Sequence, residues 1–143
     1  MILPDLNLLL HAYNAGAPDH EAARTWWETC MNGHTPVSLP WAVAIGFIRI
    51  STHPRVFARP LRVEEACRIV DEWLARPHVR TIDPAPDHFT ALRATLLALG
   101  TAGNLTTDAH LAVLAQERGC VLHSTDTDFA RFPGLTWTNP LKA

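Results

Sequence analysis

The chain has 143 residues, of which 48% are hydrophobic and 18% are charged, and its formal net charge is −2. This length and composition predict a single domain, residues 1–143, that buries a hydrophobic core. Because the net charge is slightly acidic, there is no general basic surface for nucleic acid. A contact with RNA or DNA must come from a local patch or through a metal ion.

Short apolar runs alternate with helical stripes along the chain. Residues 6, 9, 10 and 13 have the spacing of one helical face, and Gly119 is a typical helix end. The expected strands are 1–4, 35–39, 79–82, 120–123 and 135–138, and the expected helices are 6–13, 19–31, 41–51, 63–75, 87–99 and 106–118. The side chains expected to face the core on the fourth and fifth helices are Ala66, Cys67, Val70, Leu74, Phe89, Leu92 and Leu96.

The alternation of strands and helices predicts an α/β fold. Its sheet is expected to be short-stranded and mostly parallel, with right-handed crossovers and helices on both faces. The three cysteines, Cys30, Cys67 and Cys120, are widely spaced and are expected to be buried in a reducing compartment. The eight histidines show no zinc-protease spacing, and His110 and His123 have no spacing partner, so both are expected to be structural.

The location that we expect is the cytoplasm. The longest apolar run, residues 41–48, is too short to cross a bilayer, and the first residues lack the basic leader of a signal peptide. No membrane partner is therefore expected.

Acidic side chains follow two of the expected strands. Asp5 comes directly after the first strand, and Asp126 and Asp128 follow the strand at 120–123. Each has a simpler interpretation as a helix or turn cap. However, the carboxyl ends of parallel strands meet at one edge of the sheet, so Asp5 and Asp126 are expected to lie on the same edge.

Asp108 lies on the apolar stripe of the sixth helix. It shares a helical face with Leu111, Ala112 and Ala115. A carboxylate on that stripe is costly to bury without compensation, although the first turn of a helix also favours an acid through the helix dipole. Both interpretations stay open for Asp108 alone.

Three or four converging carboxylates repel one another unless a cation neutralises them. A cluster of oxygen ligands without His or Cys suits Mg²⁺ or Mn²⁺, and such a metal can activate a water molecule against a phosphodiester. The candidate metal ligands are Asp5, Asp108 and Asp126, with Asp128 as an additional catalytic acid.

Three segments of the chain resemble the PIN-domain ribonucleases, and more narrowly the VapC toxins of type II toxin–antitoxin systems. They are Asp5 with Asn7, the run from Gly103 to Leu111, and the run from Ser124 to Phe129. The stretch from Pro40 to Arg55 also fits. The resemblance covers essentially the whole chain in order, and its specificity comes from the ordered set of motifs.

This resemblance implies a PIN-like three-layer fold and a metal-dependent endoribonuclease that cuts structured RNA such as tRNA or rRNA. It also implies a homodimer and a cognate VapB antitoxin. Acids at the positions of Asp5, Asp108 and Asp126 would hold Mg²⁺ or Mn²⁺. The resemblance places Asp128 and the hydroxyl of Thr125 nearby.

One position departs from the family pattern. A Glu is usual on the third helix just before Phe47 or a few residues before it, but no acid lies between Glu28 and Glu64. The vacated position is Gly46 or Ala44, and Gly46 is favoured because it shares a helical face with Arg49. The loss removes one negative charge and a potential metal ligand, so we expect weaker metal binding, a single ion, or water in the place of the Glu.

Basic residues are concentrated in one segment. Arg49, Arg55, Arg59 and Arg62 are interpreted either as a solvated loop or as contacts to RNA phosphates, and Asn7, Arg49, Arg55 and Thr125 are the candidate substrate-binding residues. Phe57 is expected in the core rather than stacked on a base.

Two functional hypotheses follow. The first is a Mg²⁺- or Mn²⁺-dependent endoribonuclease toxin. The alternative is a PIN-like module that binds RNA or protein and has weak or lost nuclease activity, because the acid of the third helix is absent. A phosphatase with an Asp-x-Asp motif is disfavoured because that motif belongs after the first strand.

Overall fold

The structure is a computed structural model that describes residues 1–142. Its centre is a five-stranded parallel sheet with the order β3-β2-β1-β4-β5. The strands are β1 (Ile2–Pro4), β2 (Val37–Pro40), β3 (Val79–Ile82), β4 (Val121–His123) and β5 (Trp137–Thr138). The helices are α1 (Leu6–Tyr13), α2 (His20–Asn32), α3 (Trp41–Ser51), α4 (Val63–Leu74), α5 (His88–Leu99) and α6 (Thr106–Arg118), with 3-10 helices η1 (Gly103–Leu105) and η2 (Thr127–Arg131).

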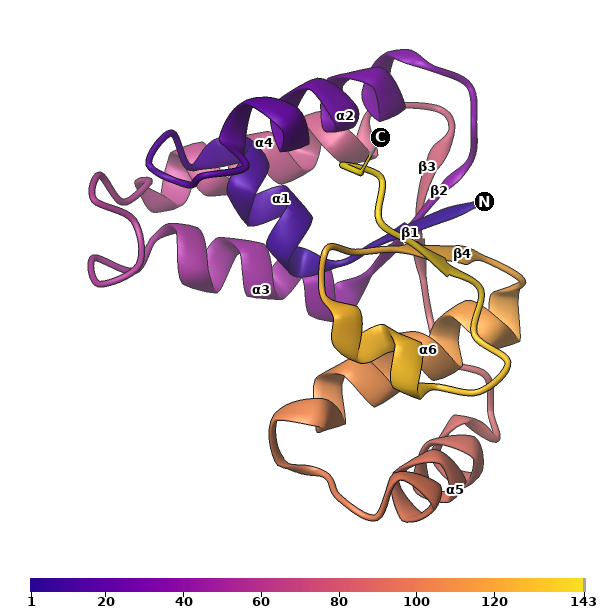
Figure 1. Cartoon of the computed structure of the whole chain (residues 1–143). Coiled ribbons are helices and arrows are strands. Elements are labelled where there is room, and N and C mark those ends of the chain that lie inside the picture. The colour runs from indigo at the N-terminus through magenta and orange to yellow at the C-terminus, as the bar shows by residue number, and fades with distance from the viewer. Residues whose placement is uncertain (143) are drawn as a thin grey trace.

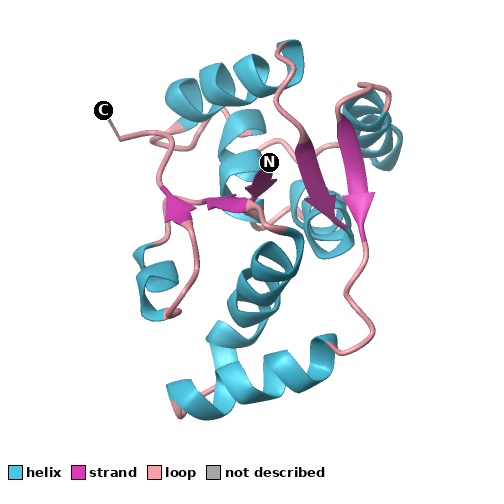
Figure 2. Cartoon of the chain, turned by 90° about the vertical axis from the view of Figure 1, so that its right-hand side faces the viewer, coloured by secondary structure: helices cyan, strands magenta, loops and turns pink. Residues whose placement is uncertain are grey.

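The helices form two layers, one on each side of the sheet (Figures 1 and 2). The chain moves from β1 to β2 and β3 in one direction, so right-handed crossovers place α1 to α4 on one face. It then returns past β1 to β4, which places α5 and α6 on the opposite face. The prediction of an α/β fold with helices on both faces of a short-stranded parallel sheet is confirmed.

The core consists of side chains from both faces of the sheet and from the inner helices. Phe47, Trp73 and Leu122 are almost completely buried, and Phe57 is also buried, as expected. No helix among residues 1–142 is long and apolar enough to cross a membrane.

Two predictions of burial are wrong. Cys67 is exposed on α4, where the inward face consists of Ala66, Ile69, Val70 and Trp73. Phe89 of α5 is 68% exposed, while Leu92 and Leu96 are partly buried. Leu74, also expected to face inward, is only partly buried.

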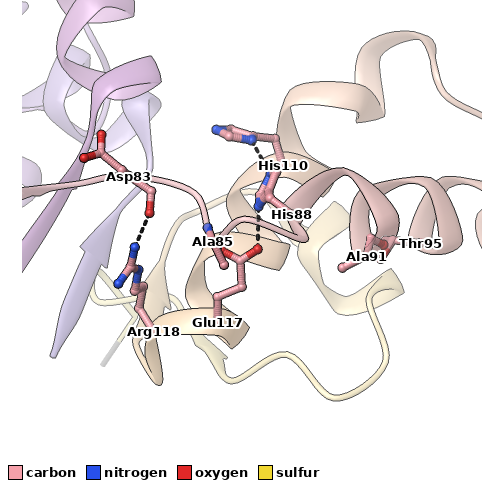
Figure 3. Close-up of polar contacts among 8 residues, drawn as sticks. All are labelled: Asp83, Ala85, His88, Ala91, Thr95, His110, Glu117 and Arg118. Atoms are coloured by element: carbon pink, nitrogen blue, oxygen red, sulfur yellow. Dashed lines mark hydrogen bonds and ion pairs between the residues drawn. The ribbon is translucent and has the colours of Figure 1, made fainter.

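Helix α5 is attached to α6 through polar contacts. The Nδ1 atom of His88 lies 2.6 Å from a carboxylate oxygen of Glu117, and the Nε2 atom of His88 lies 2.8 Å from Nδ1 of His110 (Figure 3). Glu117 also accepts a hydrogen bond from the backbone N–H of Ala85 at 3.1 Å. His110 and Glu117 are seven residues apart and therefore lie on one face of α6. His110 therefore contacts another histidine, a partner that the sequence spacing did not reveal.

Candidate active site

The candidate active site lies where the strand order reverses, between β1 and β4. These strands are neighbours, but the connection that leaves β1 and the connection that leads into β4 run on opposite faces of the sheet, which is where a crevice forms at the carboxyl ends of such strands. Asp5 follows β1 directly, and Ser124 follows β4 directly. The register pairs Pro4 with His123, which places Asp5 next to Ser124.

Asp5 is both a helix cap and a member of the site. One of its carboxylate oxygens accepts a hydrogen bond from the backbone N–H of Leu6 at 2.8 Å, which caps α1. The other accepts a hydrogen bond from the hydroxyl of Ser124 at 2.7 Å. Asp5 is only 5% exposed. The cap interpretation and the active-site interpretation therefore describe the same side chain.

Ser124 links the two strand ends and was not among the predicted site residues. It is completely buried, and its hydroxyl donates to Asp5 and accepts the backbone N–H of Asp126 at 2.9 Å. Strand alternation could have identified it. Ser124 is two residues beyond the buried Leu122, so it points to the same side of the sheet. The predicted hydroxyl, that of Thr125, makes no recorded hydrogen bond within residues 1–142.

Asp126 starts η2 and orients its carboxylate through the next turn. One of its oxygens accepts the backbone N–H of Asp128 at 2.9 Å. This contact is the turn cap expected of such an Asp-x-Asp sequence. It leaves the second oxygen of Asp126 and the exposed carboxylate of Asp128 free to face Asp108.

The carboxylates of Asp108, Asp126 and Asp128 converge. Each offers an oxygen within 4.8 Å of the others, although they come from α6 and from the segment after β4. Asp108 lies in the first turn of α6, at the end of the helix that points toward the crevice. Asp5 is outside this group of three, but its charge raises the pKa of Asp108, and the charge of Asp126 raises the pKa of Asp5.

Burial and mutual repulsion favour the protonated forms of two of these acids. Desolvation raises the pKa of Asp108 to about 6, with further contributions from Asp5, Asp126 and Asp128. Burial also raises the pKa of Asp5, against the opposing effect of its hydrogen bonds to Ser124 and Leu6. A cluster of acids whose ionised forms are disfavoured by burial and mutual repulsion is typical of a cation-binding or catalytic centre.

Helix α3 contains no acidic residue. Gly46 is buried, and a Cβ atom placed there would lie 2.7 Å from Cδ2 of Leu6, the residue after Asp5. The glycine therefore allows α3 to approach α1 closely. Ala44 is buried in the core cluster.

The other predicted substrate-binding residues lie at different distances from the acids, on α1 and along α3. Asn7 is exposed in the first turn of α1, and Arg49 is exposed in the last turn of α3. Arg55 lies in the loop after α3, and α3 has 11 residues. That helix is about 16 Å long, so Arg55 is separated from the start of α3 by the whole length of the helix.

Comparison with known proteins gives a consistent result. The sequence profile of the PIN domain matches residues 2–135. The chain is 46% identical over 142 residues to Ribonuclease VapC33 of Mycobacterium tuberculosis, covering 99% of each sequence.

The chain belongs to the PIN-domain family. Within it the chain is of the VapC type, the toxin type of the VapBC toxin–antitoxin systems. Solved structures share the fold. The crystal structure of M. tuberculosis VapC20, described as a sarcin-ricin loop cleaving toxin, superposes with a TM-score of 0.69 at 17% identity and covers 95% of this chain and 99% of that chain. The structure of VapBC2 from Rickettsia felis, bound to a promoter DNA fragment, superposes with a TM-score of 0.68 at 19% identity. The match covers 97% of this chain and 98% of that chain.

The acids of this VapC-type PIN domain fit a hard divalent cation. The converging donors are carboxylate oxygens, the ligands that Mg²⁺ and Mn²⁺ prefer, and a cation would relieve the repulsion that raises the pKa of Asp108. Asp108, Asp126 and Asp128, whose oxygens converge, are the residues that would hold it. Both oxygens of Asp5 already accept hydrogen bonds. Asp5 would therefore act on the cation mainly through its negative charge, and any direct bond to the cation would use a remaining lone pair of these oxygens.

Removing the charge at Asp108 is expected to stabilise the metal-free protein. The pKa of Asp108 is about 6 in the folded protein and 3.8 as its ordinary value, so the folded state loses stability as the pH rises from about 4 to 6. Asp108→Asn removes this penalty, worth about 1 kcal/mol after allowance for solvent screening.

The measurement is thermal unfolding in the presence of a chelator at pH 4.5 and pH 7.5. The variant should melt about 3 °C higher than the parent at pH 7.5 and only about 1 °C higher at pH 4.5. A lower melting temperature at pH 7.5 would contradict the electrostatic explanation. Asp71→Asn, at an exposed position on α4, is the matched control.

Proposed function

We propose that this chain is a Mg²⁺- or Mn²⁺-dependent endoribonuclease that hydrolyses phosphodiester bonds of cellular RNA of the tRNA or rRNA class. The observation that carries the proposal is the convergence of Asp108, Asp126 and Asp128 within 4.8 Å in a chain of the VapC type. The relatives named as ribonucleases support the reaction class, and the sarcin-ricin loop named for VapC20 supports a structured RNA substrate.

The residues of the site have separate roles. Asp108, Asp126 and Asp128 supply oxygen ligands, and Asp5 adds a buried negative charge behind them. The bound cation would supply an activated water molecule and neutralise charge at the phosphate. Ser124 fixes the direction of the Asp5 carboxylate and of the Asp126 backbone.

Contacts to the RNA are assigned to exposed or partly exposed polar groups near the acids and along α3. Asn7 and Thr125 lie next to the acids in the sequence, and the guanidinium groups of Arg49 and Arg55 extend along and beyond α3. Neither arginine forms a salt bridge with a residue of 1–142, so their charges are available to phosphates. The bound RNA would therefore run from the acids along α3.

The proposed partners are a cognate VapB-type antitoxin and a second copy of the chain. The VapC type of the relatives and the complexes among the structural neighbours support the antitoxin. Exposed apolar side chains support the homodimer: Trp41 and Ile45, one turn apart on α3, are 47% and 60% exposed, and Phe89 and Leu97 on α5 are 68% and 72% exposed. The cytoplasm, where cellular RNA is found, is the proposed location.

Metal dependence gives the direct test. The purified chain is incubated with total RNA and Mg²⁺, with Mn²⁺, or with excess chelator. Discrete fragments should form with either cation and disappear with the chelator. Cleavage that persists in the chelator would contradict the proposal, and RNA binding without cleavage under any divalent cation would support the binding-module alternative. Sedimentation of the same preparation should give the mass of a dimer.

A further inference from the structure

The carboxyl end of β4 is held by β5 through a regular parallel ladder. Leu122 donates its backbone N–H to the carbonyl of Thr136 at 2.9 Å, and Ser124 donates to the carbonyl of Thr138 at 3.1 Å. The register pairs Leu122 with Trp137 and His123 with Thr138. In a parallel ladder the next bond would run from the N–H of residue 140 to the carbonyl of Ser124.

Residue 140 cannot make that bond. It is a proline, which has no backbone N–H, and β5 ends at Thr138. The carbonyl of the fully buried Ser124 would then lack a partner from the ladder, and an unpaired polar group in such a place is costly. The indole N–H of Trp137 donates to this carbonyl instead, at 3.1 Å.

The bond from Trp137 reaches the acids through one residue. The same Ser124 whose carbonyl is held by Trp137 donates its hydroxyl to Asp5 at 2.7 Å and accepts the N–H of Asp126 at 2.9 Å. Asp126 then accepts the N–H of Asp128 at 2.9 Å. The indole of Trp137 therefore holds the peptide group of Ser124, and the positions of Asp5, Asp126 and Asp128 depend on Ser124.

We infer that Trp137 is a positioning residue of the nuclease site. Its indole N–H completes the ladder where Pro140 ends it, and so holds Ser124 in the orientation that aligns Asp5, Asp126 and Asp128 for the cation. This inference rests on the proposed metal-dependent function. Groups behind metal ligands that fix their direction commonly change metal affinity by about 10- to 100-fold when they are removed.

The test removes the donor with the smallest change of shape. Trp137→Phe deletes the indole N–H, and 3-benzothienyl-alanine at position 137 replaces the N–H by sulfur while keeping the bicyclic ring. Trp26→Phe is the matched control. Trp26 is also partly buried, it stacks on His123 of β4 with ring centroids 5.7 Å apart, and its N–H makes no hydrogen bond with residues 1–142.

Both changes at Trp137 should weaken Mn²⁺ binding, measured by calorimetry, by about tenfold. They should raise the Mg²⁺ concentration for half-maximal cleavage by a similar factor and leave KM for RNA within twofold. Trp26→Phe should leave the metal affinity unchanged. A change that is equal in the Trp137 and Trp26 variants, or Mn²⁺ affinity unchanged in the benzothienyl variant, would overturn the assignment.

A second measurement needs neither metal nor RNA. In the metal-free protein, the backbone amide of Asp126 donates to Ser124. Its hydrogen exchange should be at least fivefold faster in both Trp137 variants than in the parent, and should be unchanged in Trp26→Phe. Unchanged exchange would refute the positioning role. Failure of the parent to bind Mn²⁺ or to cleave RNA would instead refute the proposed function and leave the exchange result to stand separately.

Discussion

Replacing Asp126 with Asn is expected to abolish RNA cleavage while the protein stays folded. The Asn side chain keeps an oxygen that can accept the N–H of Asp128, the 2.9 Å bond that starts η2, so the turn is preserved. The charge and the second carboxylate oxygen are lost, and with them one of the three converging ligands. Removing one preorganised electrostatic group from an active site typically costs about 100- to 1,000-fold in rate.

The measurement is the initial rate of RNA cleavage at saturating Mg²⁺, together with the melting temperature. Asp71→Asn makes the same chemical change at an exposed position on α4 and should retain full activity. Asp126→Asn is a cleaner variant than Asp5→Ala, because Asp5 also caps α1 and is buried against Ser124. More than a tenth of the parent rate in a folded Asp126→Asn protein would exclude Asp126 as a metal ligand.

The second large effect is expected on α3, where the family pattern has a Glu. Gly46→Glu alone should lower stability by about 1–3 kcal/mol, because a Cβ at position 46 would meet Cδ2 of Leu6 at 2.7 Å and the core is close-packed. Combining Gly46→Glu with Leu6→Ala provides space for the new side chain. The double variant should then bind Mn²⁺ about tenfold more tightly than Leu6→Ala alone, since it adds a charged oxygen ligand.

The comparison at position 44 tests the alignment. Ala44 is only 2% exposed and lies in the core cluster, so Ala44→Glu buries a charge without a partner and should destabilise the protein without improving metal affinity. The Ala44→Glu variant is also compared directly with the double variant that combines Gly46→Glu and Leu6→Ala. Tighter Mn²⁺ binding by Ala44→Glu would show that the missing acid belongs at position 44, on the other face of α3.

The elements with clear boundary residues were predicted best. Helix α3 and strand β3 have the expected bounds, 41–51 and 79–82, because Pro40 and Pro54 delimit the helix and charged or proline residues flank the strand. Helix α5 was placed correctly, but its inward face was not. Apolar residues occur all around this helix, so the spacing of Phe89 and Leu92 did not distinguish the core side from the exposed side.

The candidate site shows the same limit at the level of single atoms. The sequence predicted that Asp5 and Asp126 share a sheet edge, because both follow parallel strands. Strand alternation indicates that Ser124 points inward, but the bond between its hydroxyl and Asp5 depends on the register of β1 against β4 and was not predicted. The sequence also did not predict the contact between Gly46 and Leu6, because packing distances between two helices depend on the tertiary structure.

The central position of β1 has a consequence for the order in which the fold is assembled during synthesis. The strand that precedes Asp5 is made before β4, and Ser124, the partner of Asp5, lies 119 residues later in the chain. Because a long-range pairing cannot form before both strands are available, the contact between Asp5 and Ser124 is absent during most of elongation. The acids that follow β1 and β4 are therefore brought together only late in synthesis.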